Sequence, residues 1–245
     1  MAAIKAKGRL IVGTSGDKPL LAARDPRTGQ LQGIDIDLSR EVARAIFGDP
    51  DRVEFRTISS ADRTPALTEG RVDMVAHSMT MTCDRWKQVG FSTSYYRDGQ
   101  RLLVRLDSPA KEAEDLKTSI ICAARGTTAV DSLRRLGIQN LLEVDDAADC
   151  LARFQRDEID AIASTEINLR GAQQQDPYAK IIGRRMSDES RGLAFPRENV
   201  DFIRFVNALL ERLRADGTLN TILQNRLAPL KMAVSIDEPT YGRIQ

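Results

Sequence analysis

RLIVGT, at residues 9–14, is a short apolar run of the kind that forms a buried parallel strand. VEFRTI, at residues 53–58, alternates apolar and polar side chains, and VDMVA, at residues 72–76, is again apolar, so both predict further strands. Between the first two runs, Leu38 and Val42 lie on one face of an expected helix. Strands that alternate with helices predict a parallel sheet covered by helices.

The ends of the first helices also carry signals. Asp35 or Asp37 is expected to cap the first helix, and Gly48 is expected to stop it. After the second strand, Ser60 is expected to cap a short helix that carries Pro65. These positions mark the loops around the first strands.

A second unit of the same kind begins after an expected strand at residues 101–105. Its own expected strands lie at residues 119–123, 141–144 and 159–164. One helix is expected to begin after Gly126 and another after Asp145 or Asp146. Residues 192–195 then predict a strand, and residues 200–215 predict the most periodic helix of the chain, with Gly217 as its C-cap.

Two units of similar size predict two lobes joined by two crossings, at about Arg105 and Ala194. We expect residues 1–105 and 194–245 to form the first lobe and residues 106–193 to form an inserted second lobe. Ligands in such folds bind outside the carboxyl ends of the strands, here between the lobes. The tail after Pro229 has weak periodicity and is expected to lie over the surface.

Composition excludes several classes of function. The chain has 245 residues, and its 36 basic and 35 acidic side chains leave a formal charge of +1, so a nucleic acid or a membrane surface is not expected as the main partner. No apolar run approaches the about 20 residues of a bilayer span. Residues 1–10 lack the apolar segment of a signal peptide, so the chain is expected to be either cytoplasmic or exported with its targeting segment absent from this sequence.

Reactive side chains are few. His77 is the only histidine, and it ends an expected strand, where a buried core residue is the expected role. Neither a phosphate-binding loop nor a dinucleotide-binding turn is present, and the three cysteines have no CxxC spacing. We therefore expect no metal and no cofactor.

Several motifs together resemble a known family. They are Gly33-Ile-Asp-Ile-Asp37, Gly70-Arg-Val-Asp73, Ser78-Met-Thr-Met-Thr82 with Asp84-Arg85, Phe91-Ser-Thr-Ser-Tyr95-Tyr96, Arg125-Gly-Thr-Thr128 and Leu213-Arg-Ala-Asp-Gly217. In this order and spacing they resemble the polar amino-acid-binding proteins of ABC importers, and in particular the glutamate-, aspartate- and glutamine-binding lipoproteins of actinobacteria. The resemblance implies the type II periplasmic-binding-protein fold: two lobes, each a mostly parallel sheet flanked by helices, joined by two hinge crossings.

The resemblance also implies a ligand site. Family members hold the ligand with the residues that stand here at Ser78, Thr80, Arg85 and Thr127. A free amino acid needs charged partners for its carboxylate and its ammonium, and Arg85 offers a planar fork for the carboxylate. Thr127 and Thr128 stand at an expected helix N-terminus, which favours an anion. The alternative role for Arg85 is that of a solvated or structural arginine.

The partner of the ligand's ammonium departs from the family pattern. Relatives usually carry an aspartate just after the strand that stands here at residues 160–164, whereas this chain continues with Thr165 and Glu166. Either Glu166 supplies the counter-charge, or Thr165 accepts a neutral hydrogen bond, or the ligand is not an α-amino acid. An exposed acid in the first turn of a helix is the alternative role for Glu166.

The first loop has no aromatic residue to pack on the ligand. Asp17 and Lys18 are expected to contact a polar side chain of the ligand instead. Arg63 lies in a segment that resembles an arginine-bearing segment of glutamate and aspartate binders. We therefore expect an acidic ligand whose distal carboxylate meets Arg63 or Lys18, the alternative being that both are solvated charges.

The cysteines fit an exported protein. Cys122 lies in an expected strand and Cys150 on the inner face of the next expected helix, which can bring their Cα atoms within the about 4.4–6.8 Å of a disulfide. A later cysteine pair also recurs in the similar lipoproteins. Two buried free thiols are the alternative, and Cys83 is expected to be a buried thiol near the site.

The expected function is that of an extracytoplasmic solute-binding protein, periplasmic or lipid-anchored. It would bind a polar amino acid, with a preference for glutamate or aspartate over asparagine or glutamine, by hinge closure. Its partner would be the membrane permease of an ABC importer, and the protein would be a monomer rather than an enzyme. Two alternatives are a sensory module that reports the ligand to a kinase and a dehydratase that uses Glu166 as its proton donor.

Overall fold

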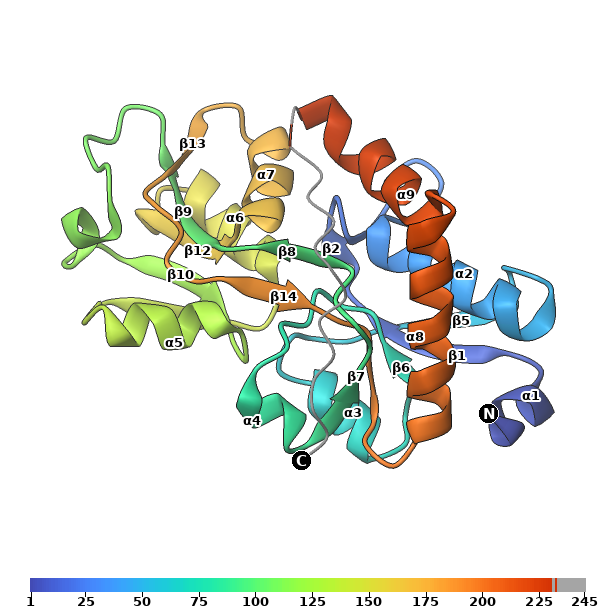
Figure 1. Cartoon of the computed structure of the whole chain (residues 1–245). Coiled ribbons are helices and arrows are strands. Elements are labelled where there is room, and N and C mark those ends of the chain that lie inside the picture. The colour runs from blue at the N-terminus through green and yellow to red at the C-terminus, as the bar shows by residue number, and fades with distance from the viewer. Residues whose placement is uncertain (231, 233–245) are drawn as a thin grey trace.

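The computed structural model describes residues 1–230 and residue 232, and two sheets with their helices form its two lobes (Figure 1). The tail after Pro229, which was expected to lie over the surface, falls mostly outside the described residues. Each helix in the described part is too short or too polar to cross a membrane.

The first sheet has the strand order β5-β1-β6-β15-β7. Its strands are β1 (Leu10–Thr14), β5 (Val53–Thr57), β6 (Met74–Val75), β7 (Val89–Phe91) and β15 (Ala194–Pro196). β15 is antiparallel to both of its neighbours, and the other four strands run in one direction, as expected for a mostly parallel sheet. One face packs against α2 (Ile34–Phe47), α8 (Val200–Ala215) and α9 (Thr218–Leu227), and α3 (Arg63–Thr68) contributes to a separate core cluster with β6 and β7.

The second sheet repeats this plan with the order β11-β10-β12-β9-β13. Its strands are β9 (Gln100–Arg105), β10 (Ile121–Ala124), β11 (Leu141–Val144), β12 (Ala161–Thr165) and β13 (Ala179–Ile182). Here β9 is the single antiparallel strand. Two core clusters pack against this sheet, one with α5 (Thr128–Arg135) and η1 (Ala113–Leu116), the other with α6 (Ala147–Gln155) and α7 (Glu166–Gln175).

Two short antiparallel strands, β8 (Tyr96–Asp98) and β14 (Glu189–Arg191), join the lobes and run side by side between the sheets (Figure 1). Their buried side chains Arg191 and Asp98 form an ion pair at 2.5 Å. The crossing expected near Arg105 is therefore misplaced: β9 pairs with β12 and β13, so residues 100–105 lie in the second lobe. The reason is that consecutive apolar residues of β9 are all buried, as in a central strand.

Three expected helix ends differ from the structure. Helix α2 begins one residue before Asp35, with Gly33 at its N-cap, so Asp35 lies in the first turn and is fully buried. Asp62, rather than Ser60, is the N-cap of α3. Gly217 is the N-cap of α9 instead of the C-cap of α8, which is Asp216.

Several short elements gave no clear signal in the sequence. They are α1 (Ala2–Lys7), the sheet of β2 (Asp17–Lys18), β3 (Ala22–Arg24) and β4 (Leu31–Gln32), α4 (Cys83–Trp86) and η2 (Ala228–Leu230). The small sheet belongs to the first lobe, and its β2 also packs against α6 and α7 of the second lobe.

The disulfide between Cys122 and Cys150 is present, with their Cα atoms 5.6 Å apart. It ties α6 to β10 and is buried in the core of the second lobe. The prediction for Cys83 is wrong, because this thiol is exposed. Cys83 opens the short helix α4, whose described residues are not buried.

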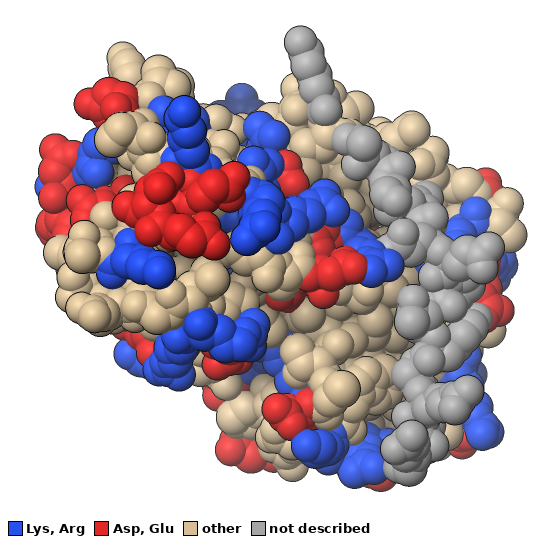
Figure 2. All heavy atoms as spheres, turned by 60° about the vertical axis from the view of Figure 1, so that its left-hand side comes forward, with Lys and Arg blue, Asp and Glu red and all other residues tan. Residues whose placement is uncertain are grey.

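Charges of both signs are interspersed on the face of the molecule shown in Figure 2. This pattern agrees with the formal charge of +1. That face offers no broad field of one sign that would attract a polyanion.

Candidate functional site

Two arginines of the first lobe converge on one backbone carbonyl of the second lobe. Nη2 of Arg63 and Nη2 of Arg85 each donate a hydrogen bond to the Gly126 oxygen at 2.9 Å. Arg85 also donates to the Thr80 oxygen at 2.9 Å, and Arg63 to the Ser60 oxygen at 2.7 Å. The two guanidinium groups thus meet between the lobes, where the sequence placed a ligand site.

Gly126 permits this close approach. Its φ of +72° suits glycine, and a Cβ at this position would stand 2.7 Å from the Cα of Ala61 in the first lobe. The turn after β10 therefore lies directly against the first lobe.

The segment that carries Ser78 and Thr80 is held by Asp35. One carboxylate oxygen of Asp35 accepts a hydrogen bond from the Ser78 amide at 2.9 Å, and the other accepts one from the Tyr95 hydroxyl at 2.6 Å. Ser78 adopts a left-handed φ of 49°, a conformation that costs free energy for a residue other than glycine. Burial raises the pKa of Asp35, and the two hydrogen bonds oppose that rise.

Arg85 is oriented by the start of its own short helix. Thr82 is the N-cap of α4, and its Oγ1 accepts a hydrogen bond from the Arg85 amide at 3.3 Å. This cap places Arg85 in the first turn, so that its side chain reaches the Thr80 oxygen. Burial lowers the pKa of Arg85, and the charge of Glu189 opposes that effect.

Glu189 is a site residue that the sequence analysis missed. It is buried on the hinge strand β14, and its Oε2 accepts hydrogen bonds from the hydroxyls of Thr80 and, at 2.9 Å, Thr128. Its Oε1 accepts from Gln100 Nε2 and Ser187 Oγ, both at 2.8 Å. An acidic residue close to an expected chain crossing is the signal that would have pointed to it.

Gln100 leaves an acceptor unused beside Glu189. Its Nε2 donates to Glu189 and, at 2.7 Å, to the Thr128 hydroxyl, whereas its buried Oε1 has no hydrogen-bond partner among the described residues. An unpaired buried acceptor is costly, and a ligand donor such as an ammonium group would satisfy it.

Lys18 and Arg63 make the first-lobe side of the site electropositive. Nζ of Lys18 lies 3.2 Å from His77 Nδ1 and 3.4 Å from Ser60 Oγ, and both Lys18 and Arg63 are buried. Burial, assisted by the charge of Arg63, lowers the pKa of Lys18 to about 8. Burial also lowers the pKa of Arg63 and of His77 well below their usual values. Among the described residues, neither cation forms an ion pair with a carboxylate.

The start of helix α5 forms the opposite wall. Thr127 is its N-cap, but the Thr127 hydroxyl donates to the Ala124 oxygen at 2.6 Å instead of capping the helix. No side chain therefore caps the first amide groups of α5, so this helix end carries the positive end of the helix dipole and favours an anion. The Thr128 hydroxyl binds Glu189, as described above.

The structure does not bring Glu166 into this cluster. Its carboxylate forms ion pairs with Arg101 at 3.3 Å, Arg170 at 3.4 Å and Arg185 at 3.5 Å. Three arginines already neutralise this carboxylate, which disagrees with the expectation that it receives a ligand ammonium. Thr165 is buried, and its Oγ1 accepts a hydrogen bond from Asn168.

Asp17 makes a contact that the sequence analysis did not expect. Its Oδ2 accepts a hydrogen bond from the Ala148 amide of the second lobe at 3.0 Å. Asp17 therefore bridges the two lobes itself, one residue before Lys18. His77, by contrast, is the buried core residue that was expected, and its Nε2 lies 3.0 Å from the Ile58 oxygen.

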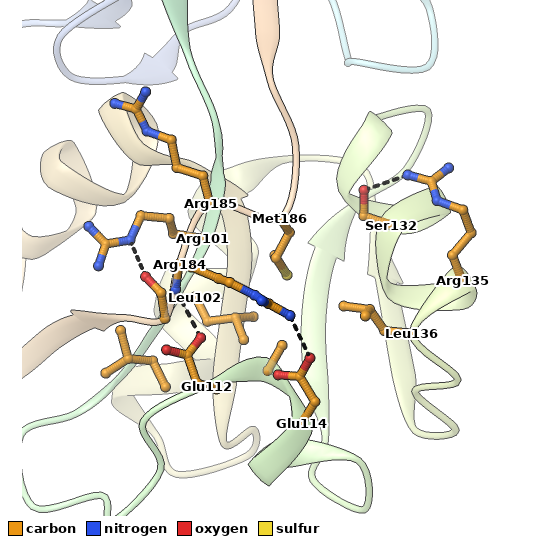
Figure 3. A pocket seen from close by; sticks show the side chains of 13 residues that line it. Arg101, Leu102, Glu112, Glu114, Ser132, Arg135, Leu136, Arg184, Arg185 and Met186 are labelled. Atoms are coloured by element: carbon orange, nitrogen blue, oxygen red, sulfur yellow. Dashed lines mark hydrogen bonds and ion pairs between the residues drawn. The ribbon is translucent and has the colours of Figure 1, made fainter.

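A separate cavity of about 400 Å³ lies wholly within the second lobe (Figure 3). Its apolar lining includes Leu102, Leu136 and Met186, and Arg184 and Glu114, which also line it, form an ion pair. No residue of the first lobe lines this cavity, so it is distinct from the interlobe cluster.

The described residues hold no group of three or more histidine, cysteine, aspartate or glutamate side chains that would bind a metal ion. The chemistry of the cluster is that of hydrogen bonding and charge pairing. Guanidinium groups, an ammonium group and uncapped amides face a carboxylate and hydroxyl groups. Such a set binds a small zwitterion or anion.

Solved structures with the same fold bind amino acids. A solute receptor for L-cysteine from Neisseria gonorrhoeae has a TM-score of 0.90 at 26% identity, with 95% of this chain and 96% of that chain covered. A mutant of the T. maritima protein ArgBP has a TM-score of 0.87 at 27% identity, with 93% and 98% covered. These matches confirm the two-lobed α/β fold expected from the sequence.

Proteins of similar sequence are also named as amino-acid-binding proteins. A glutamine-binding protein of Geobacillus stearothermophilus is 32% identical over 201 residues, which cover 81% of this chain and 77% of that protein. The glutamate-binding protein GluB of Corynebacterium glutamicum is 30% identical over 256 residues, which cover 99% and 85%. These relatives are solute-binding proteins and not enzymes. A family model matches residues 10–227, and the chain accordingly belongs to the bacterial extracellular solute-binding proteins, family 3.

Proposed function

We propose that this protein binds an acidic amino acid, glutamate or aspartate, between its lobes and delivers it to the membrane permease of an ABC importer. The observation that carries the proposal is the set of three cations, Arg63, Arg85 and Lys18, that surround the site; none of them forms an ion pair with a carboxylate of residues 1–230. Glu189 supplies a carboxylate in direct hydrogen-bond contact with threonines of both lobes. A ligand with two carboxylates and one ammonium group complements this arrangement.

Each group of the ligand then has a partner. Arg85, the Thr80 segment and the N-terminus of α5 bind the α-carboxylate, because a guanidinium fork and uncapped amides both favour an anion. Glu189 and the free Oε1 of Gln100 receive the α-ammonium, in place of Glu166. Arg63 and Lys18 bind the distal carboxylate, which gives each buried cation an opposite charge.

Closure follows from the same contacts. Arg63 and Arg85 belong to the first lobe, Thr127 and Thr128 to the second, and Glu189 to the hinge strand between them. A ligand that contacts all three parts is bound more tightly by the closed arrangement than by an open one, and this difference drives closure. The names of the relatives, glutamine- and glutamate-binding proteins, support a ligand that is an amino acid with a polar side chain.

Calorimetry on protein that has been unfolded, stripped of ligand and refolded tests the specificity. The ligands are glutamate, aspartate, glutamine, asparagine and glutarate, which is a dicarboxylate without an ammonium group. We expect the two acidic amino acids to bind at about micromolar Kd and the amides and glutarate at least about tenfold more weakly. Glutamine binding as tight as glutamate binding would refute the acidic preference.

We propose a monomer outside the cytoplasm, periplasmic or lipid-anchored, since the family comprises extracellular solute-binding proteins and the buried disulfide suits an oxidising compartment. Light scattering on the purified protein tests the monomer. Stimulation of the ATPase of the cognate importer in vesicles, only when glutamate is present, tests delivery.

A further inference from the structure

The contact between Asp17 and Ala148 joins the lobes outside the ligand cluster. Asp17 begins β2 in the first lobe, and Ala148 lies in the first turn of α6 in the second lobe. The hydrogen bond from the Ala148 amide to Oδ2 of Asp17 measures 3.0 Å. β2 packs against α6 at the same place. The bond therefore requires the two lobes to be together.

Helix α6 lacks a cap of its own. Its N-cap residue is Asp146, yet the Asp146 side chain makes no capping hydrogen bond. The first amide groups of a helix need an acceptor from elsewhere, and the helix dipole favours a carboxylate at this end. Asp17 provides that acceptor from the opposite lobe.

The disulfide links α6 rigidly to the ligand-binding turn. Cys150, two residues after Ala148, is bonded to Cys122 in β10, and β10 leads directly into Gly126 and Thr128. The start of α6 and the turn at Gly126 thus belong to one rigid unit. When that unit moves away from the first lobe, the bond between Ala148 and Asp17 must break along with the bonds from Arg63 and Arg85.

We propose that Asp17 is a closure latch, a positioning residue that stabilises the closed arrangement by capping α6 from the opposite lobe and touches no part of the ligand. The inference rests on the proposed function, because it concerns the closure of the same site. The latch raises the affinity for every ligand by the same factor, since it is made or broken with closure whatever the site contains.

The hydrogen bond, and not the charge, makes the latch. Asp145, Asp146 and Asp149 carry negative charges at the start of the same helix; Arg125 pairs with Asp145, Arg153 pairs with Asp149, and the charge of Lys18 acts on Asp146. Burial raises the pKa of Asp146, and the charges of Asp17 and Asp145 raise it further. Repulsion between Asp17 and Asp146 across the lobes opposes closure, so a neutral acceptor at position 17 is expected to serve as well as aspartate.

Three variants test the latch by calorimetry with glutamate, aspartate and glutamine. Asp17→Ala is expected to raise the Kd of each ligand about two- to tenfold, the usual effect of removing a helix cap, with the ratio between ligands unchanged. Asp17→Asn keeps an acceptor and is expected to stay within about twofold of the wild type. Asp107→Ala, at an exposed aspartate of the second lobe, is the control and should leave the Kd of each ligand unchanged.

The donor side provides an independent check. Ala148→Pro removes the amide hydrogen at a first-turn position, where proline is tolerated. It should weaken binding as much as Asp17→Ala does, and the double variant should be no weaker than either single one. The fluorescence of Trp86, the only tryptophan, reports ligand release in stopped flow, and release should accelerate by the same factor as the Kd.

A measurement without ligand separates the latch from the proposed function. Without ligand, Asp17→Ala is expected to speed hydrogen exchange at the Ala148 amide in proportion to the closed fraction that the ligand-free protein populates. A wild type that binds none of the amino acids refutes the proposed function and leaves this exchange test standing. Unchanged exchange and unchanged Kd in Asp17→Ala overturn the latch, and an altered ratio between ligands shows that Asp17 contacts the ligand directly.

Discussion

Thr80 of the first lobe and Thr128 of the second lobe donate hydrogen bonds to the same atom, Oε2 of Glu189 on the hinge strand. A single carboxylate therefore receives one donor from each lobe and is itself carried by the crossing between them. We therefore expect a change at Glu189 to affect both closure and the binding of a charged ligand. Glu189 can therefore be compared with Glu166, which the sequence had suggested as the partner of the ligand's ammonium.

Glu189→Gln removes the proposed counter-charge of the ligand's ammonium. We expect the affinity for glutamate to fall about thirtyfold or more, because a buried charge pair loses one partner. Glu166→Gln is the matched control and should leave affinity within about twofold, since that carboxylate is occupied by three arginines. Calorimetry measures both variants. The reverse ranking would restore the sequence-based assignment.

Arg85→Ala should abolish measurable binding of any carboxylate ligand while the circular dichroism spectrum stays that of the wild type. The reason is that the guanidinium is the proposed partner of the α-carboxylate and makes no ion pair that holds the fold together in the described residues. Lys87→Ala, two residues along and exposed, is the control. Affinity that stays within about threefold in Arg85→Ala would remove the assigned role.

Gly126→Ala should weaken binding by hindering closure. The new Cβ would stand 2.7 Å from the Ala61 Cα in the opposite lobe, at a backbone φ of +72°. Gly137→Ala is a close control, because Gly137 has the same φ of +72° but nothing within 4 Å of its added Cβ. Both variants carry the same backbone strain, so a loss of ligand affinity confined to Gly126→Ala measures the contact between the lobes. Equal affinities would show that the lobes close without this approach.

Lys18→Met should stabilise the fold and reduce the preference for glutamate over glutamine. The folded pKa of Lys18, about 8, is below its ordinary 10.5, so the unfolded chain binds more protons between these values and stability rises with pH across that window. The cost of the buried charge, about 3 kcal/mol at neutral pH, should therefore vanish near pH 10.5. Urea unfolding of both proteins at pH 7 and pH 10.5 checks this. A wild type as stable as Lys18→Met at pH 7 would contradict it.

Reduction of the disulfide should lower the free energy of unfolding by about 3–4 kcal/mol, the range for a loop of this size in the entropic model. Mass spectrometry after alkylation should find one reactive thiol without reductant, from exposed Cys83, and three with it. Cys83→Ser should not change stability, which controls for the effect of the reagent. Three alkylated thiols before reduction would rule out the bond in the isolated protein.

Local signals in the sequence were sufficient to predict the two-lobed α/β architecture. The apolar runs at β1, β10 and β11 and the amphipathic helix α8 lie where periodicity predicted them, because burial on a sheet or against a core imposes that pattern on consecutive residues. Arg63 and Arg85 were expected from the family resemblance and Thr128 from its place at a helix N-terminus, and the structure brings all three between the lobes. The disulfide followed from a strand and the helix packed on it.

The charge partners were decided only by tertiary structure. Glu166 was one of the candidates for the ligand's ammonium because it follows the strand after which relatives carry an aspartate, yet three arginines from β9, α7 and the loop after β13 converge on it. Glu189 lies in a strand of three residues that has no periodicity to read, and its donors come from both lobes. Local sequence determines where a side chain sits on its own element, whereas the charges that face it come from segments up to about a hundred residues away, and only the packed fold brings them within hydrogen-bond distance.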